Sequence, residues 1–232
     1  MKYIDLSHEI KDNSPAFPED PEFSLAKISK KEDSYSLFKI NGGLHVGTHI
    51  DAPYHYLEEG SKVNSLKLNN LIGNANIFKL RNDLKNDISN SINSSSSISL
   101  SSISNHEIKI KDIENFNIKE NIKKNKFSKI AILNTSWYKN YGNEEYFIKN
   151  PYISKELAKL FIENNIKGIA IDSCSVDKYG ENKIHKIFLK NDIWIVENLT
   201  NLDKLVENSY YSYFIPINIA AEASYIRAFV QL

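Results

Sequence analysis

The side chains best suited to chemistry are concentrated in the eleven residues from His45 to His55. This run holds three of the six histidines of the chain, His45, His49 and His55, together with Asp51. Imidazole and carboxylate groups are the ligands that divalent ions such as Zn²⁺ bind in proteins. We therefore predict a metal site on His45, His49 and Asp51, in preference to a histidine-rich loop without a metal.

The spacing of these ligands restricts the backbone that could join them. Along a regular strand His45 and His49 would lie roughly 13 Å apart, at about 3.3 Å per residue, which is too far to share one ion. A regular helix would bring the two together but turn Asp51 away from them. Gly47 permits a sharp bend and Pro53 enforces one. The sequence therefore predicts a tight turn around an ion.

The last histidine of the run, His55, has a different expected role. Pro53 separates it from the ligand turn, so His55 is placed to stand beside the ion. An imidazole in that position, with a pKa near neutrality, would serve as a general acid or base. Two alternatives stay open, because His55 could also be a third histidine ligand or a contact to a ligand.

A second pair of ligand types lies far along the chain. His185 falls on a predicted short helix, and Glu197 follows a predicted strand over residues 193–196. Their separation suits a helix–turn–strand hairpin whose two ends return to one place. We predict that this pair forms the second half of the site.

The elements that must position these residues read as a mixed α/β domain with substantial antiparallel content. Apolar and β-branched runs predict strands over residues 23–28, 36–44, 76–80, 129–134, 168–171, 193–196, 210–219 and 225–231. A helix is predicted over residues 155–164, with Ser154 as its N-cap, and a shorter one over 183–190. The last two strands are expected to be antiparallel around a turn.

One segment stands apart from this pattern. Residues 82–105 contain ten Ser and five Asn and no aromatic residue. Such a segment buries too little apolar surface to offset its ordering entropy, so we predict a flexible insertion in a surface loop. We predict that residues 1–232 form a single domain that carries this insertion.

The composition excludes several classes of protein. Lys and Arg balance Asp and Glu at 29 each, so no overall field attracts nucleic acid or an anionic membrane. No apolar run approaches the roughly 18 residues of a membrane span, and residues 1–9 carry charges where a secretory signal needs an apolar run. Cys174 is the single cysteine, which excludes an intramolecular disulfide and a thiolate-rich zinc site. A cytoplasmic location is the expectation.

The run from His45 to His55 resembles the His-x-Gly-Thr-His-x-Asp-x-Pro-x-His signature of the cyclase family of metal-dependent hydrolases. Members of that family include bacterial kynurenine formamidases (arylformamidases) and isatin hydrolases. Shorter resemblances cover residues 4–7, 18–21, 133–137, 168–177 and 197–203. The similarity extends over nearly the whole chain apart from the Ser/Asn-rich insertion.

The resemblance implies a swivelling β/β/α fold with mixed, largely antiparallel sheets and packed helices, in a homodimer or homotetramer. It implies two Zn²⁺ ions, with Mn²⁺ as the alternative metal. Carried over by position, His45, His49 and Asp51 would hold the first ion, and Asp51, His185 and Glu197 the second. His55 matches the position with a proton-transfer role.

The activity implied is hydrolysis of a small-molecule amide, N-formylkynurenine, to kynurenine and formate through a metal-activated water. Phe17 stands where formamidases have a substrate-binding tryptophan, and it offers a smaller ring without an indole donor. Ala221, Glu222, Ala223 and Ser224 replace a turn that is richer in glycine. The alternatives are a related hydrolase or cyclase acting on another cyclic amide, lactam or lactone, and a non-catalytic metal-binding protein.

Overall fold

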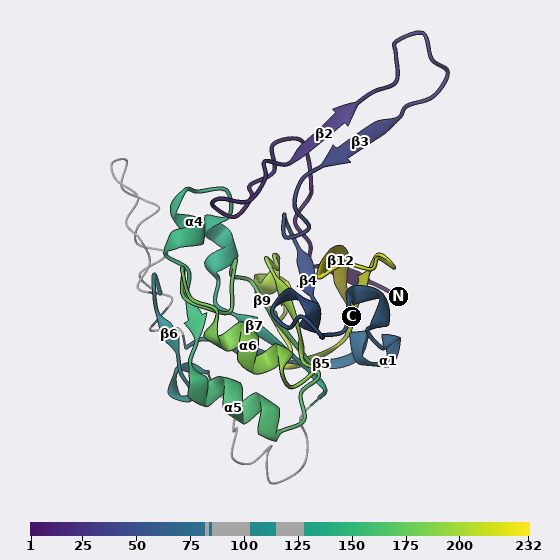
Figure 1. The fold of residues 1–232 in the computed structure, drawn as a ribbon. Coiled ribbons are helices and arrows are strands. Elements are labelled where there is room, and N and C mark those ends of the chain that lie inside the picture. The colour runs from purple at the N-terminus through teal and green to yellow at the C-terminus, as the bar shows by residue number, and fades with distance from the viewer. Residues whose placement is uncertain (82–83, 85–102, 115–127) are drawn as a thin grey trace.

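A single eight-stranded sheet forms the body of the protein, and helices cover one of its faces (Figure 1). The computed structural model describes residues 1–81, 84, 103–114 and 128–232. The predicted Ser/Asn-rich insertion lies outside the described residues except at 84 and 103–105. The strands are β1 (Tyr3–Asp5), β2 (Ser24–Lys27), β3 (Phe38–Asn41), β4 (His49–Asp51), β5 (Ile72–Lys79), β6 (Glu107–Ile108), β7 (Ile130–Asn134), β8 (Tyr152–Ile153), β9 (Gly168–Ile171), β10 (Trp194–Glu197), β11 (Ser209–Pro216) and β12 (Ala223–Gln231). The helices are α1 (Leu68–Leu71), α4 (Glu145–Ile148), α5 (Lys155–Glu163) and α6 (Lys183–Leu189).

The large sheet closes on itself. Its strand order is β1-β12-β11-β5-β7-β9-β10-β4, and β12 also pairs with β4. The neighbours among β5, β7, β9 and β10 are parallel, whereas the other pairings of this sheet are antiparallel. The predicted mixed and largely antiparallel α/β architecture is confirmed, and the closed sheet agrees with a swivelling β/β/α fold.

The core has two layers because successive residues of a strand face opposite sides of the sheet. On β7, Ala131 and Leu133 pack with the helices, whereas Ile130 and Ile132 point into the closed sheet. Helix α5 begins as predicted, since the Ser154 hydroxyl accepts a hydrogen bond from the Leu157 backbone N–H at 3.2 Å. The predicted helix–strand unit of α5 followed by β9 is also present, and β9 has the predicted bounds.

Strands β2 and β3 form a hairpin arm that projects from the body (Figure 1). Both strands were predicted, but they pair with each other and stay outside the large sheet. All four residues of β3 are exposed, including Phe38 and Ile40 at 53% and 57%. An isolated two-stranded ribbon buries little apolar surface, so contacts beyond the hairpin must contribute to its stability.

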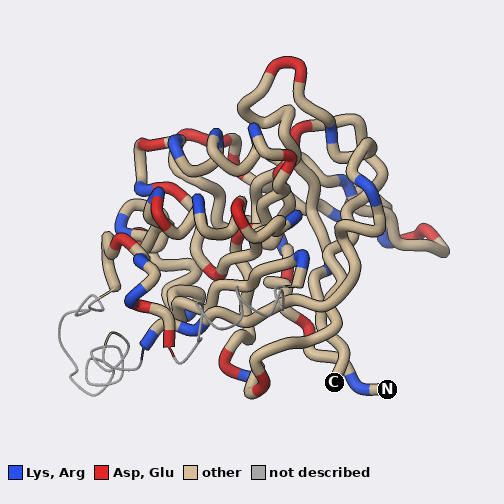
Figure 2. The backbone as a smooth tube through the Cα atoms, turned by 90° about the horizontal axis from the view of Figure 1, so that it is seen from below, with Lys and Arg blue, Asp and Glu red and all other residues tan. Residues whose placement is uncertain are grey.

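Charged residues are interspersed along the chain. Figure 2 shows Lys and Arg positions interspersed with Asp and Glu positions along the described backbone, as seen from below. This distribution agrees with the balanced composition. Among the described residues, no helix is long and apolar enough to cross a membrane.

Candidate active site

The centre of the site is β4, a three-residue strand that carries His49 and Asp51 on one face. Its backbone follows a bend in which Gly47 has φ +64°, a conformation that glycine adopts without strain. The predicted turn is therefore correct for residues 45–48. It is wrong for residues 49–51, which are extended: two residues separated by one in a strand share a face, so no further bend is needed to bring His49 to Asp51.

Strand β10 places Glu197 against this face. Glu197 is the register partner of His49 in the antiparallel β10–β4 pair. Nε2 of His49 lies 3.6 Å from a carboxylate oxygen of Asp51 and 3.6 Å from one of Glu197. His49 on β4 thus lies beside a carboxylate of β10, a strand that is far away in the sequence.

Helix α6 brings His185 to the same place, as the predicted helix–turn–strand hairpin requires. Its Nε2 lies 3.2 Å from Glu197 Oε1 and 3.5 Å from Asp51 Oδ2. All three side chains are buried. The structure therefore brings together the two halves of the site predicted from the sequence.

Asp177 orients His185. Its carboxylate accepts hydrogen bonds from the backbone N–H groups of Ile184 and His185, and Oδ2 lies 2.8 Å from Nδ1 of the His185 ring. A carboxylate on Nδ1 fixes the tautomer and leaves Nε2 directed at the site. Asp172, the other aspartate considered for such a role, instead accepts hydrogen bonds from Thr135.

We expect Asp177→Asn to weaken the binding of added Zn²⁺ by about 10–100-fold, the usual cost of removing the carboxylate partner of an imidazole that holds a metal. Competition titration with a chromophoric chelator measures this change. Asp192→Asn is the matched control, because Asp192 is exposed in the turn after α6. Equal zinc affinities for Asp177→Asn and the wild type would show that Asp177 does not orient a ligand.

His45 completes one side of the cluster from the bend before β4. Its Nδ1 lies 3.0 Å from Asp51 Oδ1, and its Nε2 lies 3.7 Å from Glu222 Oε1. The sequence did not identify Glu222 as part of the site. It reaches His45 because Ala223 pairs with Asp51 where β12 meets β4, and this pairing is visible only once residues 49–51 are known to be a strand.

The charged groups of the cluster shift one another's pKa values. Burial alone would lower the pKa of His45, but Asp51 and Glu222 raise it to about 10. Burial would raise the pKa of Asp51, yet the positive charge of the His45 imidazole holds it well below its usual range. Without an ion the cluster therefore holds protons on imidazole nitrogens, and a divalent cation must displace them to bind.

The protonation state of His49 differs from that of His45. Burial lowers the pKa of His49, so its ring is neutral, and Nδ1 lies 2.9 Å from the Gly47 carbonyl oxygen, to which Nδ1–H donates. That hydrogen bond leaves the lone pair of Nε2 directed toward Asp51 and Glu197.

The buried atoms at the centre fit a bound cation. Within the described part of the chain, Nε2 of His49 and both carboxylate oxygens of Asp51 are buried without a hydrogen bond, and only the imidazole–carboxylate contacts given above reach them. Buried polar atoms are rarely left without a partner. Donor atoms of His49, Asp51 and Glu197 lie within 4.8 Å of one another, as do those of His45, Asp51 and His55. Both groups have the composition that Zn²⁺ or Mn²⁺ prefers.

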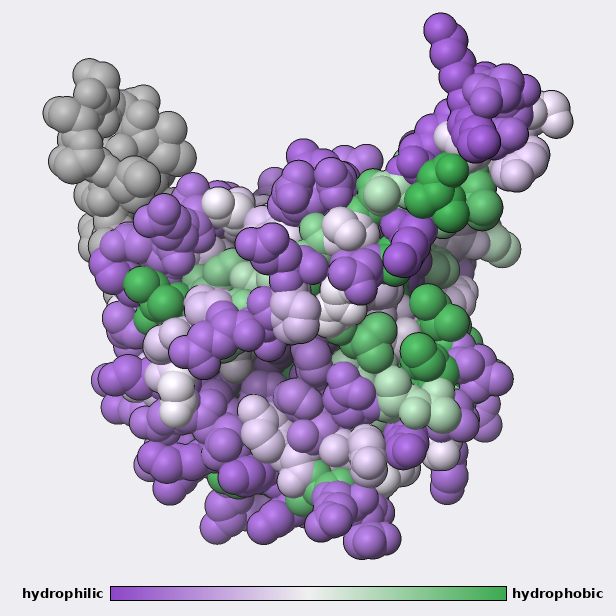
Figure 3. Space-filling view, turned by 45° about the horizontal axis from the view of Figure 1, so that its top comes forward, coloured by the Kyte–Doolittle hydropathy of each residue, from purple (hydrophilic) through white to green (hydrophobic). Residues whose placement is uncertain are grey.

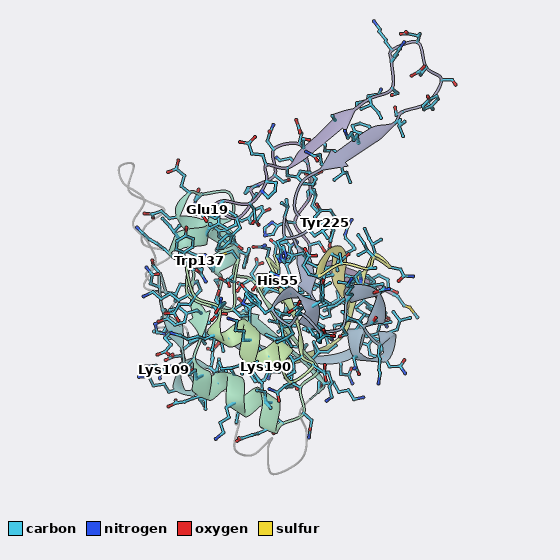
Figure 4. All side chains as sticks on the ribbon, in the orientation of Figure 1. Glu19, His55, Lys109, Trp137, Lys190 and Tyr225 are labelled. Carbon is cyan, nitrogen blue, oxygen red and sulfur yellow. The ribbon has the colours of Figure 1, made fainter. Side chains whose placement is uncertain are left out.

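His55 lies beside the cluster, on the 3₁₀ turn Pro53–His55 (Figure 4). Its ring centroid is 4.5 Å from that of His45 and 5.7 Å from that of His185. Burial, together with the nearby cationic imidazoles, lowers the pKa of His55 to about 4. The expected near-neutral pKa is not found, because the sequence did not reveal how deeply this ring is enclosed.

A cavity of about 740 Å³ opens above these residues. Phe17 lines it, packs edge-on against Phe147 at 5.8 Å and stacks with Tyr179 at 5.7 Å. Tyr56 lines it beside His185, with ring centroids 5.2 Å apart. The volume suits a single-ring aromatic ligand. Tyr56 and Tyr179 were not identified from the sequence, since isolated tyrosines in loops give no periodic signal.

The Cyclase family model matches residues 4–178, which include the bend, β4 and Asp177. This chain belongs to the cyclase family. The match covers about three quarters of the sequence, so the membership predicted from the run between His45 and His55 is confirmed.

Similar proteins agree with this membership. A kynurenine formamidase of Bacillus cereus is 29% identical over 237 residues, which cover 99% of this chain and 97% of the relative. Among solved structures, an isatin hydrolase bound to the product analogue thioisatinate has a TM-score of 0.78 at 19% identity, covering 100% of this chain and 92% of that one. A protein described as a potential metal-dependent hydrolase with cyclase activity has a TM-score of 0.72 at 20% identity, covering 99% and 96%. The two structures share the fold of this cyclase-family chain.

Proposed function

We propose that this chain is a metal-dependent hydrolase of the arylformamidase type, which converts N-formylkynurenine to kynurenine and formate. The convergence of Asp51 with imidazoles from two parts of the chain carries the proposal. Asp51 lies within 3.6 Å of nitrogens of His45, His49 and His185. Full-length similarity to a kynurenine formamidase supports the choice of substrate.

In this proposal two ions share Asp51. His45 and His49 complete the ligands of the first, and His185 and Glu197 those of the second. Zn²⁺ is the expected metal and Mn²⁺ the alternative. Cys174, the single thiol of the chain, is buried and directed at the carbonyl oxygens of Tyr146 and Phe147, so the donors are imidazoles and carboxylates.

When bound, a divalent ion supplies Lewis acidity and a water whose pKa is lowered from 15.7 to about 7. The protein supplies proton transfer and orientation. His55 is neutral at pH 7 because its pKa is about 4, so it can accept a proton and pass it to the departing aromatic amine. Phe17 holds the aromatic ring of the substrate by stacking.

A related hydrolase of a cyclic amide, lactam or lactone is the second candidate. The fold similarity to an isatin hydrolase favours it, as does the ring of Phe17 in place of an indole. Parallel assays with N-formylkynurenine, isatin and a simple aryl formamide separate the two.

Release of formate from N-formylkynurenine tests the main proposal. We expect turnover by the metal-loaded protein, loss of turnover after dialysis against a chelator, and recovery on addition of Zn²⁺. Turnover that persists without metal, or no turnover of N-formylkynurenine by the metal-loaded protein, would contradict it. Ion content is measured on the same samples. Bound metal without any turnover would indicate a metal-binding protein that is not an enzyme.

We further propose that residues 1–232 act as one hydrolase domain in a homodimer or homotetramer. The exposed apolar residues of the arm support assembly, because a second copy would bury them. Figure 3 shows hydrophobic side chains at the base of the arm and along the adjoining side of the body. Light scattering after size exclusion should give two or four times the chain mass of 26.6 kDa; a monomer mass would contradict the proposal. A cytoplasmic location remains a prediction that cell fractionation tests.

A further inference from the structure

Two short segments of the cavity lining contact each other. One is residues 17–20 and the other is residues 178–181, and both line the cavity. They meet where Phe17 stacks on Tyr179, with ring centroids 5.7 Å apart and planes inclined by 30°. A ring held at Phe17 would therefore carry its substituents between these two segments.

Lys178 gives the second segment a positive charge. Of the Lys and Arg residues that the structure describes, Lys178 alone lines this cavity. The structure shows no carboxylate within ion-pair distance of it in the described part of the chain. The neighbouring acid Glu181 is already paired, since it lies 2.9 Å from Lys183. The Lys178 ammonium is thus free to bind an anionic group.

The opposite segment carries negative charge. Glu19 and Asp20 line the cavity and are exposed, and Figure 4 shows Glu19 on the same side of His55 as the base of the arm. Glu222, which also lines the cavity, faces His45 at 3.7 Å. The lining therefore has the unpaired Lys178 in one segment and the carboxylates of Glu19 and Asp20 in the other.

The position of Lys178 is fixed relative to the metal ligands. The preceding residue, Asp177, is bound through its carboxylate to the backbone of Ile184 and to the backbone and ring of His185. Its own backbone N–H donates to Ser175 Oγ at 3.1 Å. A charge held on such a segment can discriminate between substrates, because its backbone cannot drift away from the reacting centre.

We propose that Lys178 is a specificity-determining residue, which binds the carboxylate of an aromatic amide with an amino-acid tail, while Glu19 and Asp20 accept the ammonium group of that tail. This inference rests on the proposed function and adds the residue that selects a zwitterionic substrate over a neutral one. Lys178 acts in binding and takes no part in proton transfer.

The test compares two formamides on the zinc-loaded full-length protein. N-formylkynurenine carries the amino-acid tail, and 2′-formamidoacetophenone has the same ring and formamide without it. For Lys178→Ala we expect KM for N-formylkynurenine to rise about tenfold, with kcat within about twofold of the wild type. Kinetics on 2′-formamidoacetophenone should not change. Lys178→Arg should retain most of the preference, and Lys190→Ala, which alters an exposed lysine outside the cavity, should retain all of it.

The outcomes separate this inference from the proposed function. Equal effects of Lys178→Ala on both substrates, or no effect on either, would overturn the role of Lys178 while leaving the hydrolase proposal intact. If the wild type hydrolyses neither formamide, the proposed function is wrong and this inference fails with it. A loss of the preference for N-formylkynurenine in Lys178→Ala alone supports the inference.

Discussion

We expect His55→Ala to keep its bound metal and to lose turnover by about 10²–10⁴-fold, the usual contribution of a general acid–base group. The reason is the position of the ring, which lies next to His45 and His185 while its burial keeps it neutral. Loss of the imidazole removes the proton carrier between the attacking water and the leaving amine. Formate release and metal content by mass spectrometry, measured on the same sample, give both quantities.

Tyr54→Phe is the matched control for this variant. Tyr54 is the exposed residue next to His55 on the same 3₁₀ turn, so it reports any disturbance of the turn itself. The donor atoms of His55 also lie close enough to those of His45 and Asp51 to share an ion. Disappearance of metal from His55→Ala would therefore assign His55 as a ligand and contradict its role in proton transfer.

Asp51→Asn should have the largest effect on metal binding. Asp51 is the acid common to both donor groups, and its carboxylate also balances the positive charge on His45 and His185. An amide of the same shape cannot balance that charge or offer two anionic oxygens. We expect metal affinity to fall by more than the roughly 10–100-fold typical of an outer-sphere change, and activity to fall with it.

Glu58→Gln is the control for Asp51→Asn. Glu58 is exposed and lies a few residues after the 3₁₀ turn in the sequence, so its change removes a carboxylate that does not line the cavity. Thermal unfolding with excess chelator checks that Asp51→Asn is folded. A folded variant that binds zinc as tightly as the wild type would show that Asp51 holds no ion.

The metal cluster could be predicted from the sequence because its residue types are unusual together. His45, His49 and Asp51 lie within seven residues, and few structural roles call for such a group. The pairing of His185 with Glu197 followed from a helix and a strand of the right lengths. Regular elements such as α5 and β9 could be predicted because their apolar residues form clear patterns.

Other parts could not be predicted because they depend on long-range pairing. Strand β4 has only three residues, so its polar–apolar–polar alternation is too short to predict a strand. Its extended conformation comes from β10 and β12, which hydrogen-bond to it from either side. The same pairing with β12 closes the sheet and delivers Glu222 to His45. The low pKa of His55 likewise follows from tertiary burial.

Anomalous diffraction from a zinc-loaded crystal, recorded at the zinc edge, would locate the bound ions relative to Asp51. We expect two peaks that share the Asp51 carboxylate, one bound by His45 and His49 and the other by His185 and Glu197. Peaks located elsewhere, or none within bonding distance of Asp51, would contradict this expectation.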